Sequence, residues 1–185
     1  MTPKEYALSI FNLLPPGVDA LAFIGGGCFR SLFDGTEVKD IDLFFASYTD
    51  YLLALQFFSW EPRFSELKSD VSGARIFSDG VNPPFNLVGF RFHKTLGDLV
   101  ADFDLTCVTC GAEMVEPGVV EVIEGPDFVC DASHKYLRFN KVQNHDRAVK
   151  RIARYESYGY TRTRSVAAQL VRSRFIPAPK HGGDY

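Results

Sequence analysis

Two aspartates, Asp40 and Asp42, stand inside an otherwise apolar stretch, "KDIDLFF" at residues 39–45. Strand side chains alternate between two faces, so both carboxylates lie on one face while Ile41 and Leu43 point to the other. Adjacent carboxylates repel each other, and burying them without partners is costly. A divalent cation removes that cost, because Mg²⁺ is typically bound by one or two carboxylates together with substrate phosphates. A polar sheet edge is the alternative explanation for the pair alone.

A glycine-rich turn precedes this pair. Three glycines at residues 25–27 follow a short apolar strand, predicted over residues 20–24, and lead into a short helix predicted over residues 28–34. Such a turn lets backbone N–H groups approach phosphate oxygens closely. Arg30 lies one turn into the helix, where it can pair with a phosphate. The phosphate cradle and the carboxylate pair together predict a site for a nucleotide and a divalent cation.

The stretch resembles the head domain of the DNA polymerase β-type nucleotidyltransferase superfamily, in the version found in tRNA nucleotidyltransferases (CCA-adding enzymes) and bacterial poly(A) polymerases. That version has Gly-Gly-x-x-Arg-Asp, then a further glycine, then Asp-x-Asp. The residues that match in register are Gly26, Gly27, Arg30, Gly35, Asp40 and Asp42. Ser31 stands where the family has its aspartate, and Gly25 adds a third glycine to the turn.

A second match lies downstream. The segment "FDLT" at residues 103–106 is similar to the family's Asp-Phe-Thr segment, which implies that Asp104 supplies a third carboxylate. Asp102, two residues earlier, is the rival for that role. The family's paired arginines before this motif are absent from the chain. The resemblance covers roughly residues 20–110.

The resemblance implies a minimal nucleotidyltransferase with a polymerase β-like core. It implies transfer of a nucleoside monophosphate from an NTP, expected to be ATP or CTP, to an acceptor hydroxyl with release of pyrophosphate. The expected acceptor is an RNA or tRNA 3′ end, and the expected cofactors are two Mg²⁺ or Mn²⁺ ions held by Asp40, Asp42 and Asp104. The expected nucleotide-binding residues are Gly26, Gly27, Arg30, Lys39, Arg147, Lys150, Arg151 and Arg154.

Charge is unevenly distributed along the chain. Residues 1–134 contain eight Lys or Arg against twenty Asp or Glu, whereas residues 135–174 contain eleven against two. A helix predicted over residues 145–158, capped by Asn144, places four cations on one face, namely Arg147, Lys150, Arg151 and Arg154. Because like charges at this spacing repel, we expect the face to meet a polyanion in the cleft opposite the aspartates. A solvated basic surface is the alternative.

The order of the predicted elements indicates an α+β fold with a mixed β-sheet, flanking helices and a short C-terminal helical extension. Helices are predicted from a capping box at Thr2 and Glu5, and over residues 28–34, 49–60 with Thr49 as cap, 96–103, 145–158 and 165–174. Strands are predicted over residues 20–24, 39–45, 74–77, 85–92, 104–109 and 118–123. We divide the chain into a catalytic core (1–134), a basic extension that completes the cleft (135–176) and a flexible tail (177–185).

Composition narrows the class of protein. The 185 residues are 46% hydrophobic and 14% aromatic, enough for a core without disulfides. No apolar run approaches the ~20 residues of a membrane span, and the N-terminus lacks the pattern of a signal peptide. These features favour a cytoplasmic protein with reduced thiols. A zinc site is the alternative to free core cysteines, because one set has suitable spacing: Cys107, Cys110, Cys130 and His134.

Two other functions stay open. One is a toxin- or antitoxin-type nucleotidyltransferase that modifies a protein or a tRNA, and the other is a non-catalytic nucleotide- or nucleic-acid-binding module of the same fold. The intact Asp40 and Asp42 pair argues against the second, because a pure binder gains nothing from adjacent like charges. We do not expect a complete CCA-adding enzyme, because the family's base-selecting Glu-Asp-x-x-Arg motif has no counterpart in register: Val149 follows Asp146 where an arginine is required.

Overall fold

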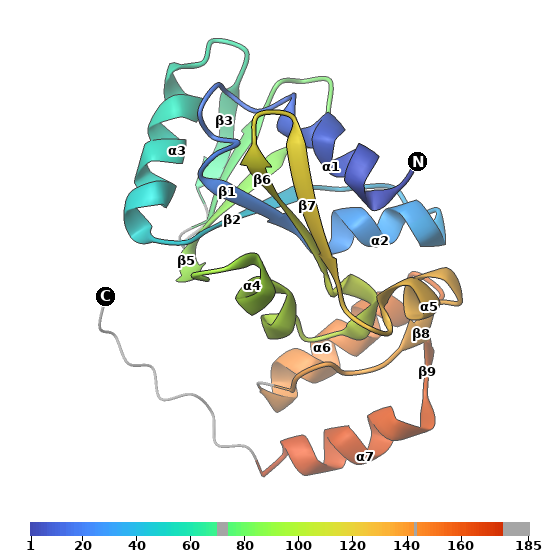
Figure 1. Ribbon diagram of the computed structural model, residues 1–185. Helices are drawn as coiled ribbons and strands as arrows, with labels where there is room; N and C mark the ends of the chain where they lie inside the picture. The colour runs from blue at the N-terminus through green and yellow to red at the C-terminus, as the bar shows by residue number, and fades with distance from the viewer. Residues whose placement is uncertain (70–73, 143, 176–185) are drawn as a thin grey trace.

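The computed structural model describes residues 1–69, 74–142 and 144–175. A seven-stranded mixed β-sheet forms the centre, and helices pack against both of its faces (Figure 1). The predicted α+β fold with a mixed sheet is therefore confirmed. The tail predicted over residues 177–185 lies outside the described residues. No helix in the described part of the chain combines the length and apolar character needed to cross a bilayer.

The strands are β1 (Ala22–Gly25), β2 (Ile41–Phe45), β3 (Ser65–Ser69), β4 (Ala74–Ser78), β5 (Phe85–Phe92), β6 (Cys110–Glu116), β7 (Val119–Glu124), β8 (Tyr136–Leu137) and β9 (Thr161–Arg162). The main sheet has the order β3-β4-β5-β2-β1-β6-β7, so β2 is its central strand. It pairs parallel with β5 and antiparallel with β1. The short strands β8 and β9 form a separate parallel pair.

The helices are α1 (Pro3–Phe11), α2 (Gly27–Asp34), α3 (Tyr48–Trp60), α4 (Leu96–Asp102), α5 (Phe128–Ser133), α6 (His145–Glu156) and α7 (Arg164–Ser173). The capping box of α1 is present, since Thr2 and Glu5 bond each other's backbone N–H groups at 3.2 and 2.7 Å. Asn144 caps α6 as predicted. The prediction of Thr49 as the cap of α3 is wrong, because the Ser47 hydroxyl accepts the capping bond instead.

The strand predicted over residues 104–109 is also wrong. This segment contains a 3₁₀ turn, η1 (Thr106–Val108), and the next strand begins only at Cys110. Residues on both faces of the segment are buried, so its short apolar run could not distinguish a strand from a turn. Five elements were not predicted at all, namely the strands β3, β6, β8 and β9 and the short helix α5.

Alternate residues of the central strands face two separate layers. Ile24, Leu43 and Leu87 belong to the larger core, which includes residues of α1, α2 and α3. The residues of opposite parity, Phe23, Phe44 and Val88, belong to a smaller cluster with α4. Asp42 has the parity of Phe44, so its carboxylate lies on the α4 side of the sheet, while Ile41 and Leu43 are buried on the other side as predicted.

The basic C-terminal segment joins the main core. Ala148, Ile152 and Tyr155 form the buried face of α6 and belong to the same apolar cluster as α1 and α2. The hydroxyl of Tyr160 donates a 2.9 Å hydrogen bond to Asp34 at the end of α2. Figure 1 shows α6 and α7 below the sheet, on the side where α4 and η1 lie. The opposite, basic face of α6 is thereby turned towards the start of β2.

Replacing Gly25 with alanine should lower the thermal midpoint. The added Cβ would lie 2.9 Å from the ring of Phe103 and 3.3 Å from Leu99, in a packed region. Overpacking of this kind costs about 1–3 kcal/mol, which corresponds to a midpoint roughly 2–10 °C lower for a chain of this size. Gly97→Ala is the matched control, because its Cβ meets nothing closer than 3.8 Å. Equal midpoints for the two variants would contradict the described packing.

Candidate functional site

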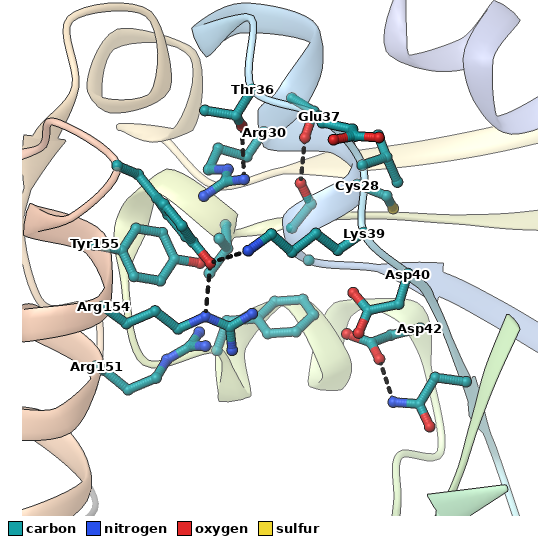
Figure 2. Close-up of a pocket in the computed structure, with 18 of the residues that line it drawn as sticks. Cys28, Arg30, Thr36, Glu37, Lys39, Asp40, Asp42, Arg151, Arg154 and Tyr155 are labelled. Atoms are coloured by element: carbon teal, nitrogen blue, oxygen red, sulfur yellow. Dashed lines mark hydrogen bonds between the residues drawn. The ribbon is translucent and has the colours of Figure 1, made fainter. Parts of the chain in front are cut away.

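A cavity of about 580 Å³ lies between the start of β2, the start of α2 and the basic face of α6 (Figure 2). Most of the predicted site residues line it: Gly26, Gly27, Arg30, Lys39, Asp40, Asp42, Arg147, Arg151 and Arg154. Two do not. Lys150 faces a shallow depression on the outer side of α6, beside Asp146, and Asp104 lines a second, adjoining cavity.

The two aspartates lie next to each other at the floor of the first cavity (Figure 2). Asp40 is exposed just before β2, and Asp42 is half-buried on it. Burial, together with the charge of Asp40, raises the pKa of Asp42 to about 6. Asn86 stands opposite Asp42 in the parallel register of β5, and its Nδ2 donates a 2.7 Å hydrogen bond to Asp42 Oδ1. The Oδ1 atom of Asn86 is buried and has no partner among the described residues.

These donors suit a small, hard cation. Two carboxylates and one unpaired amide oxygen are the oxygen ligands that Mg²⁺ prefers, and Mg²⁺ usually completes its shell with phosphate oxygens and water. Within the described ranges, no three or more His, Cys, Asp or Glu side chains form a group able to hold a metal. Asp104 is therefore not gathered with the pair, and its role as a third carboxylate stays a prediction.

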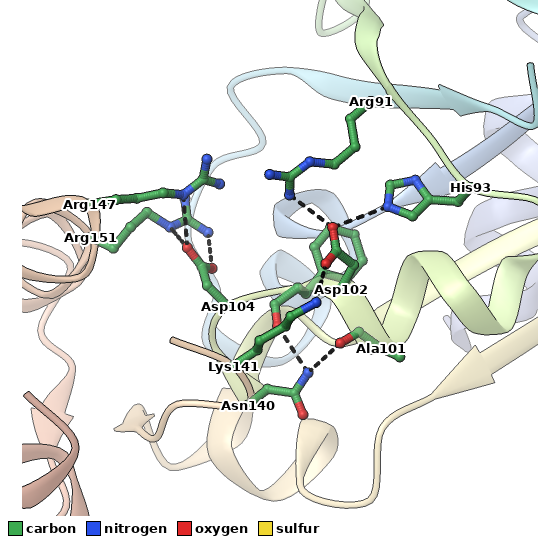
Figure 3. Close-up of polar contacts among 10 residues, drawn as sticks. Arg91, His93, Ala101, Asp102, Asp104, Asn140, Lys141, Arg147 and Arg151 are labelled. Carbon is green, nitrogen blue, oxygen red and sulfur yellow. Dashed lines mark hydrogen bonds and ion pairs between the residues drawn. The ribbon is translucent and has the colours of Figure 1, made fainter. Parts of the chain in front are cut away.

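Both candidates for that third carboxylate are in ion pairs (Figure 3). Asp104 is buried and accepts two 2.9 Å bonds from Arg151, with Arg147 at 3.6 Å. Although burial opposes its charge, Arg151 has a raised pKa because of neighbouring Tyr155 and Asp104. The basic helix is thus tied to the core through a carboxylate next to the site.

Asp102 lies at the centre of a second set of charges. It pairs with Arg91 at 2.9 Å, with Lys141 at 2.7 Å and with His93 at 3.2 Å. Burial alone would raise the pKa of Asp102, but bonds from Lys141 and His93 and the charge of Arg91 lower it. This carboxylate remains ionised and holds three side chains around the second cavity.

The glycine turn has the geometry of a ligand cradle. Gly26 has a φ of +85°, a conformation that glycine adopts without strain, and it caps α2. Gly27 lines the cavity, and a Cβ placed on it would meet nothing within 4 Å. The start of α2 therefore presents backbone N–H groups to open space, and such helix starts favour anions.

Three cations gather around the ring of Tyr158 at the same end of the cavity. Its hydroxyl accepts a hydrogen bond from Arg154 at 3.0 Å and another from Lys39 at 3.4 Å. Both bonds lower the pKa of Tyr158, and the bond from Arg154 has the larger effect. The guanidinium of Arg30 lies 5.3 and 5.1 Å from the centres of the Tyr155 and Tyr158 rings. Lys39 and Arg154 are exposed, so both can turn to a bound anion.

Arg30 is held more firmly. It is buried, pairs with Asp34 at 3.2 Å and donates a 2.8 Å bond to Thr36. Its predicted contact with a phosphate is compatible with its place in the cavity wall. Its ion pair and hydrogen bond stay within α2 and the loop that follows, and it contacts the end of α6 through the rings of Tyr155 and Tyr158.

Several residues of the two cavities were missed by sequence reasoning, among them Asn86, Phe90 and Phe103. The alternation of β5 carried a signal for the first two. Asn86, Val88 and Phe90 share one face of that strand, and the face of Asn86 is fixed by its pairing with Asp42. Phe103 belongs to the "FDLT" segment, and its ring packs against Gly25 and Gly26.

The four residues with zinc-like spacing do not form a metal site in the described part of the chain. Cys107 and Cys110 are buried, and burial raises the pKa of both thiols, that of Cys107 to about 12. Both belong to the main apolar cluster, where they pack as small apolar groups. Cys130 is exposed on α5, with its Sγ 3.9 Å from His134.

Comparison with known proteins gave one family and one fold. A family model described as Gad2, Gabija anti-defense 2 family protein, matches residues 7–117. A search of curated protein sequences found no match.

Several solved structures share the fold. A CCA-adding enzyme in complex with CTP matches with a TM-score of 0.70 at 16% identity, over 94% of this chain and 44% of that chain. A CCA-adding enzyme in complex with ATP matches with a TM-score of 0.68 at 15% identity, over 91% of this chain and 42% of that chain. A Thermotoga maritima CCA-adding enzyme complexed with tRNA matches with a TM-score of 0.61 at 14% identity, over 94% of this chain and 42% of that chain. The polymerase β-like nucleotidyltransferase fold is thereby confirmed. This chain spans less than half the length of each of these three enzymes.

Removing the charge of Asp42 should stabilise the metal-free protein at neutral pH. The folded-state pKa of about 6 lies above the ordinary value of 3.8. The unfolded chain therefore releases this proton first, and stability falls as the pH rises from about 4 to about 6. In EDTA, Asp42→Asn should raise the thermal midpoint at pH 7.5 and change it little near pH 4. Glu116→Gln, at an exposed position of β6, is the control. A variant that is less stable than wild type at pH 7.5 would refute the predicted repulsion.

Proposed function

The chain belongs to the Gabija anti-defense 2 (Gad2) family, and we propose that it is a metal-dependent nucleotidyltransferase. In this proposal it transfers a nucleoside monophosphate from ATP or CTP to an acceptor hydroxyl, as at an RNA or tRNA 3′ end, and releases pyrophosphate. One observation carries the proposal. The Asp40 and Asp42 pair, with the buried and unpaired Oδ1 atom of Asn86 beside Asp42, lies at a cavity that five Lys or Arg side chains also line.

The metal ligands in this proposal are Asp40, Asp42 and the Oδ1 atom of Asn86. When bound, two Mg²⁺ or Mn²⁺ ions neutralise charge on the attacking and leaving oxygens of an in-line displacement at the α-phosphate. Asn86 fixes the orientation of Asp42 through its 2.7 Å bond. Asp104 could join these ligands only after Arg151 releases its two bonds to that carboxylate.

The triphosphate would lie at the other end of the cavity. The backbone N–H group of Gly27 faces the phosphates at the start of α2, whereas the N–H group of Gly26 donates a 3.0 Å bond to the carbonyl of Cys110 and so holds the turn in place. Lys39 and Arg154 turn from Tyr158 to the phosphate oxygens, and charge-assisted bonds of this kind are among the strongest available. Arg30 is a positioning residue, because it fixes the two tyrosine rings against α2. Catalysis would come from positioning and from electrostatic stabilisation of the developing charge.

A second candidate differs only in the acceptor. The description of the family as anti-defense favours an acceptor hydroxyl on a component of the Gabija system, whether protein or nucleic acid. Labelled transfer from each α-³²P-NTP to isolated Gabija components, in parallel with total RNA, distinguishes the two. Label on a Gabija component without label on total RNA would select the second candidate. A non-catalytic binding module would show nucleotide binding without any transfer.

Substitution of either aspartate should abolish transfer. Asp40→Asn and Asp42→Asn each remove one ligand charge, and we expect the rate to fall by about 100-fold or more. The readout is pyrophosphate release and label incorporation with Mg²⁺ and each NTP. Glu116→Gln, at an exposed position of β6, is the control and should keep the wild-type rate. Unchanged transfer in Asp42→Asn would exclude catalysis at this pair.

Substitutions of two arginines of α6 should affect different properties, one the stability of the fold and the other the binding of NTP. Arg151→Gln leaves buried Asp104 with only the more distant Arg147, so we expect a loss of about 3 kcal/mol in stability. Arg154→Gln affects an exposed side chain, so it should weaken NTP binding and leave the thermal midpoint within about 2 °C. The measurements are thermal unfolding and calorimetric titration with Mg²⁺ and ATP. Equal midpoints for both variants would contradict the Arg151–Asp104 pair.

A further inference from the structure

The last strand of the main sheet, β7, has a neighbouring strand on one side only. It pairs antiparallel with β6 along its whole length, and the sheet ends there. Within the described ranges, its backbone groups make no hydrogen bond beyond that pairing. The outer edge of β7 is therefore a row of unpaired N–H and C=O groups, which is the feature that lets a further strand add to a sheet.

The composition and regularity of β7 favour such an addition. The strand contains no proline, and most of its residues are β-branched, namely Val119, Val120, Val122 and Ile123. The irregularity in its pairing with β6 lies on β6, where Val115 is the extra residue, so β7 itself runs without a bulge. The opposite edge strand, β3, has an extra residue at Leu67, and a bulge of this kind protects an edge from pairing.

The two faces of β7 differ in character. Val120 is buried in the main core, on the side of α1, and Val122 packs against the same core. Glu121 lies on the other face and is exposed. A strand that continues the sheet beyond β7 would therefore extend an apolar surface on one face and stand beside a carboxylate on the other.

That carboxylate has no cation to balance it. Glu113 on β6 stands directly opposite Glu121 in the antiparallel register, and like charges in this position destabilise a sheet. Burial, together with the charge of Glu121, raises the pKa of Glu113. Neither glutamate forms an ion pair with a described residue.

The surroundings of Glu113 increase the negative charge. A hollow of about 180 Å³ beside it is also lined by Asp19 and Asp50, and the described residues of its wall include no Lys, Arg or His. In the described part of the chain, no three or more such carboxylates gather closely enough to hold a metal ion. A cationic side chain on an added strand would reduce this repulsion and satisfy the open backbone edge at the same time.

We propose that β7 is a docking edge for an extended segment of another protein, in which apolar residues alternate with Lys or Arg. The segment continues the sheet, its apolar face extends the surface of Val120 and Val122, and its cations lie opposite Glu121. A nucleic acid does not suit this edge, because its phosphates would meet carboxylates. A second copy would bring the glutamates of its own β7 to the same edge. The described residues of β7 line neither of the two cavities of the proposed catalytic site, so this inference is independent of the transfer reaction.

The test uses the complete chain and a fluorescein-labelled peptide in which valine alternates with lysine, with anisotropy as the readout. A second peptide alternates valine with glutamate. A third is the lysine peptide methylated at every backbone nitrogen, which keeps the side chains but cannot donate backbone hydrogen bonds. We expect only the first peptide to bind, and hydrogen exchange to slow at β7 and stay unchanged at β3.

Three results would overturn the proposal. Equal binding of the methylated peptide would exclude strand addition, and protection confined to β3 would place the docking edge at the other end of the sheet. Absence of binding by the lysine peptide would mean that the glutamates serve to keep the edge of β7 from pairing at all. A protein that sediments as a dimer, and that the lysine peptide dissociates, would assign the edge to a second copy instead.

Charge-reversed variants locate the contact. Glu121→Lys should weaken binding of the lysine peptide about five- to tenfold and allow the glutamate peptide to bind, because an attractive cross-strand pair becomes a repulsive one. The thermal midpoint of this variant should not fall, since the repulsion with Glu113 is removed. Glu124→Lys is the matched control, because it makes the same change in net charge on the opposite face of the same strand. Equal effects of the two variants would refute the placement of the cations beside Glu121.

Discussion

Repulsion between Asp40 and Asp42 is the interaction on which the arrangement of this molecule depends. Two carboxylates are held together at the start of a central strand, and burial, together with the charge of Asp40, raises the pKa of Asp42. The surrounding residues reduce the free-energy cost of keeping both carboxylates charged. Asn86 donates to Asp42, and the charges of Arg151 and Arg154 on α6 lower the Asp42 pKa from the other side. The acidic first part of the chain and the basic last part are therefore complementary: one forms the floor of the cavity and the other its roof.

The cations of the roof have two different tasks. Arg151 is bound to Asp104, and Arg30 lies between the Tyr155 and Tyr158 rings, so both attach α6 to the core. A buried pair of this kind adds little net stability, but breaking it is costly, and it fixes one geometry. The side chain of Arg154, by contrast, contacts the hydroxyl and ring of Tyr158 and has no ion pair within the described ranges. The cations on one face of α6 thus differ in burial. The more buried side chain attaches the helix to the core, and the exposed one is available to a ligand.

Much of this could be predicted from the sequence, because the decisive residues were close together in it. The glycine turn, α2 and the Asp-x-Asp strand span about twenty positions, and the spacing alone fixed their faces. Lys150 was misplaced because helical periodicity gives a face about 100° wide and does not say where the cavity ends. Asn86 and Phe90 were missed because their relation to Asp42 depends on the pairing of β5 with β2, two strands separated in sequence by α3 and a hairpin. The 3₁₀ turn at Thr106–Val108 was taken for a strand because tertiary contacts bury both of its faces.

The two sides of the cavity should differ in how readily they open, because β2 lies at the centre of the sheet and α6 lies at the surface of the fold. The backbone of β2 is hydrogen-bonded to β1 on one side and β5 on the other, with further strands beyond each. Its amide protons can exchange with solvent only when the whole sheet opens. The α6 helix is attached by one apolar stripe and a few ion pairs, so its amides exchange through local opening at a lower free energy. We therefore expect the carboxylates to keep their geometry during local openings of the cationic wall opposite them. In that case the C-terminal segment would set the rate at which anything bound between them enters and departs.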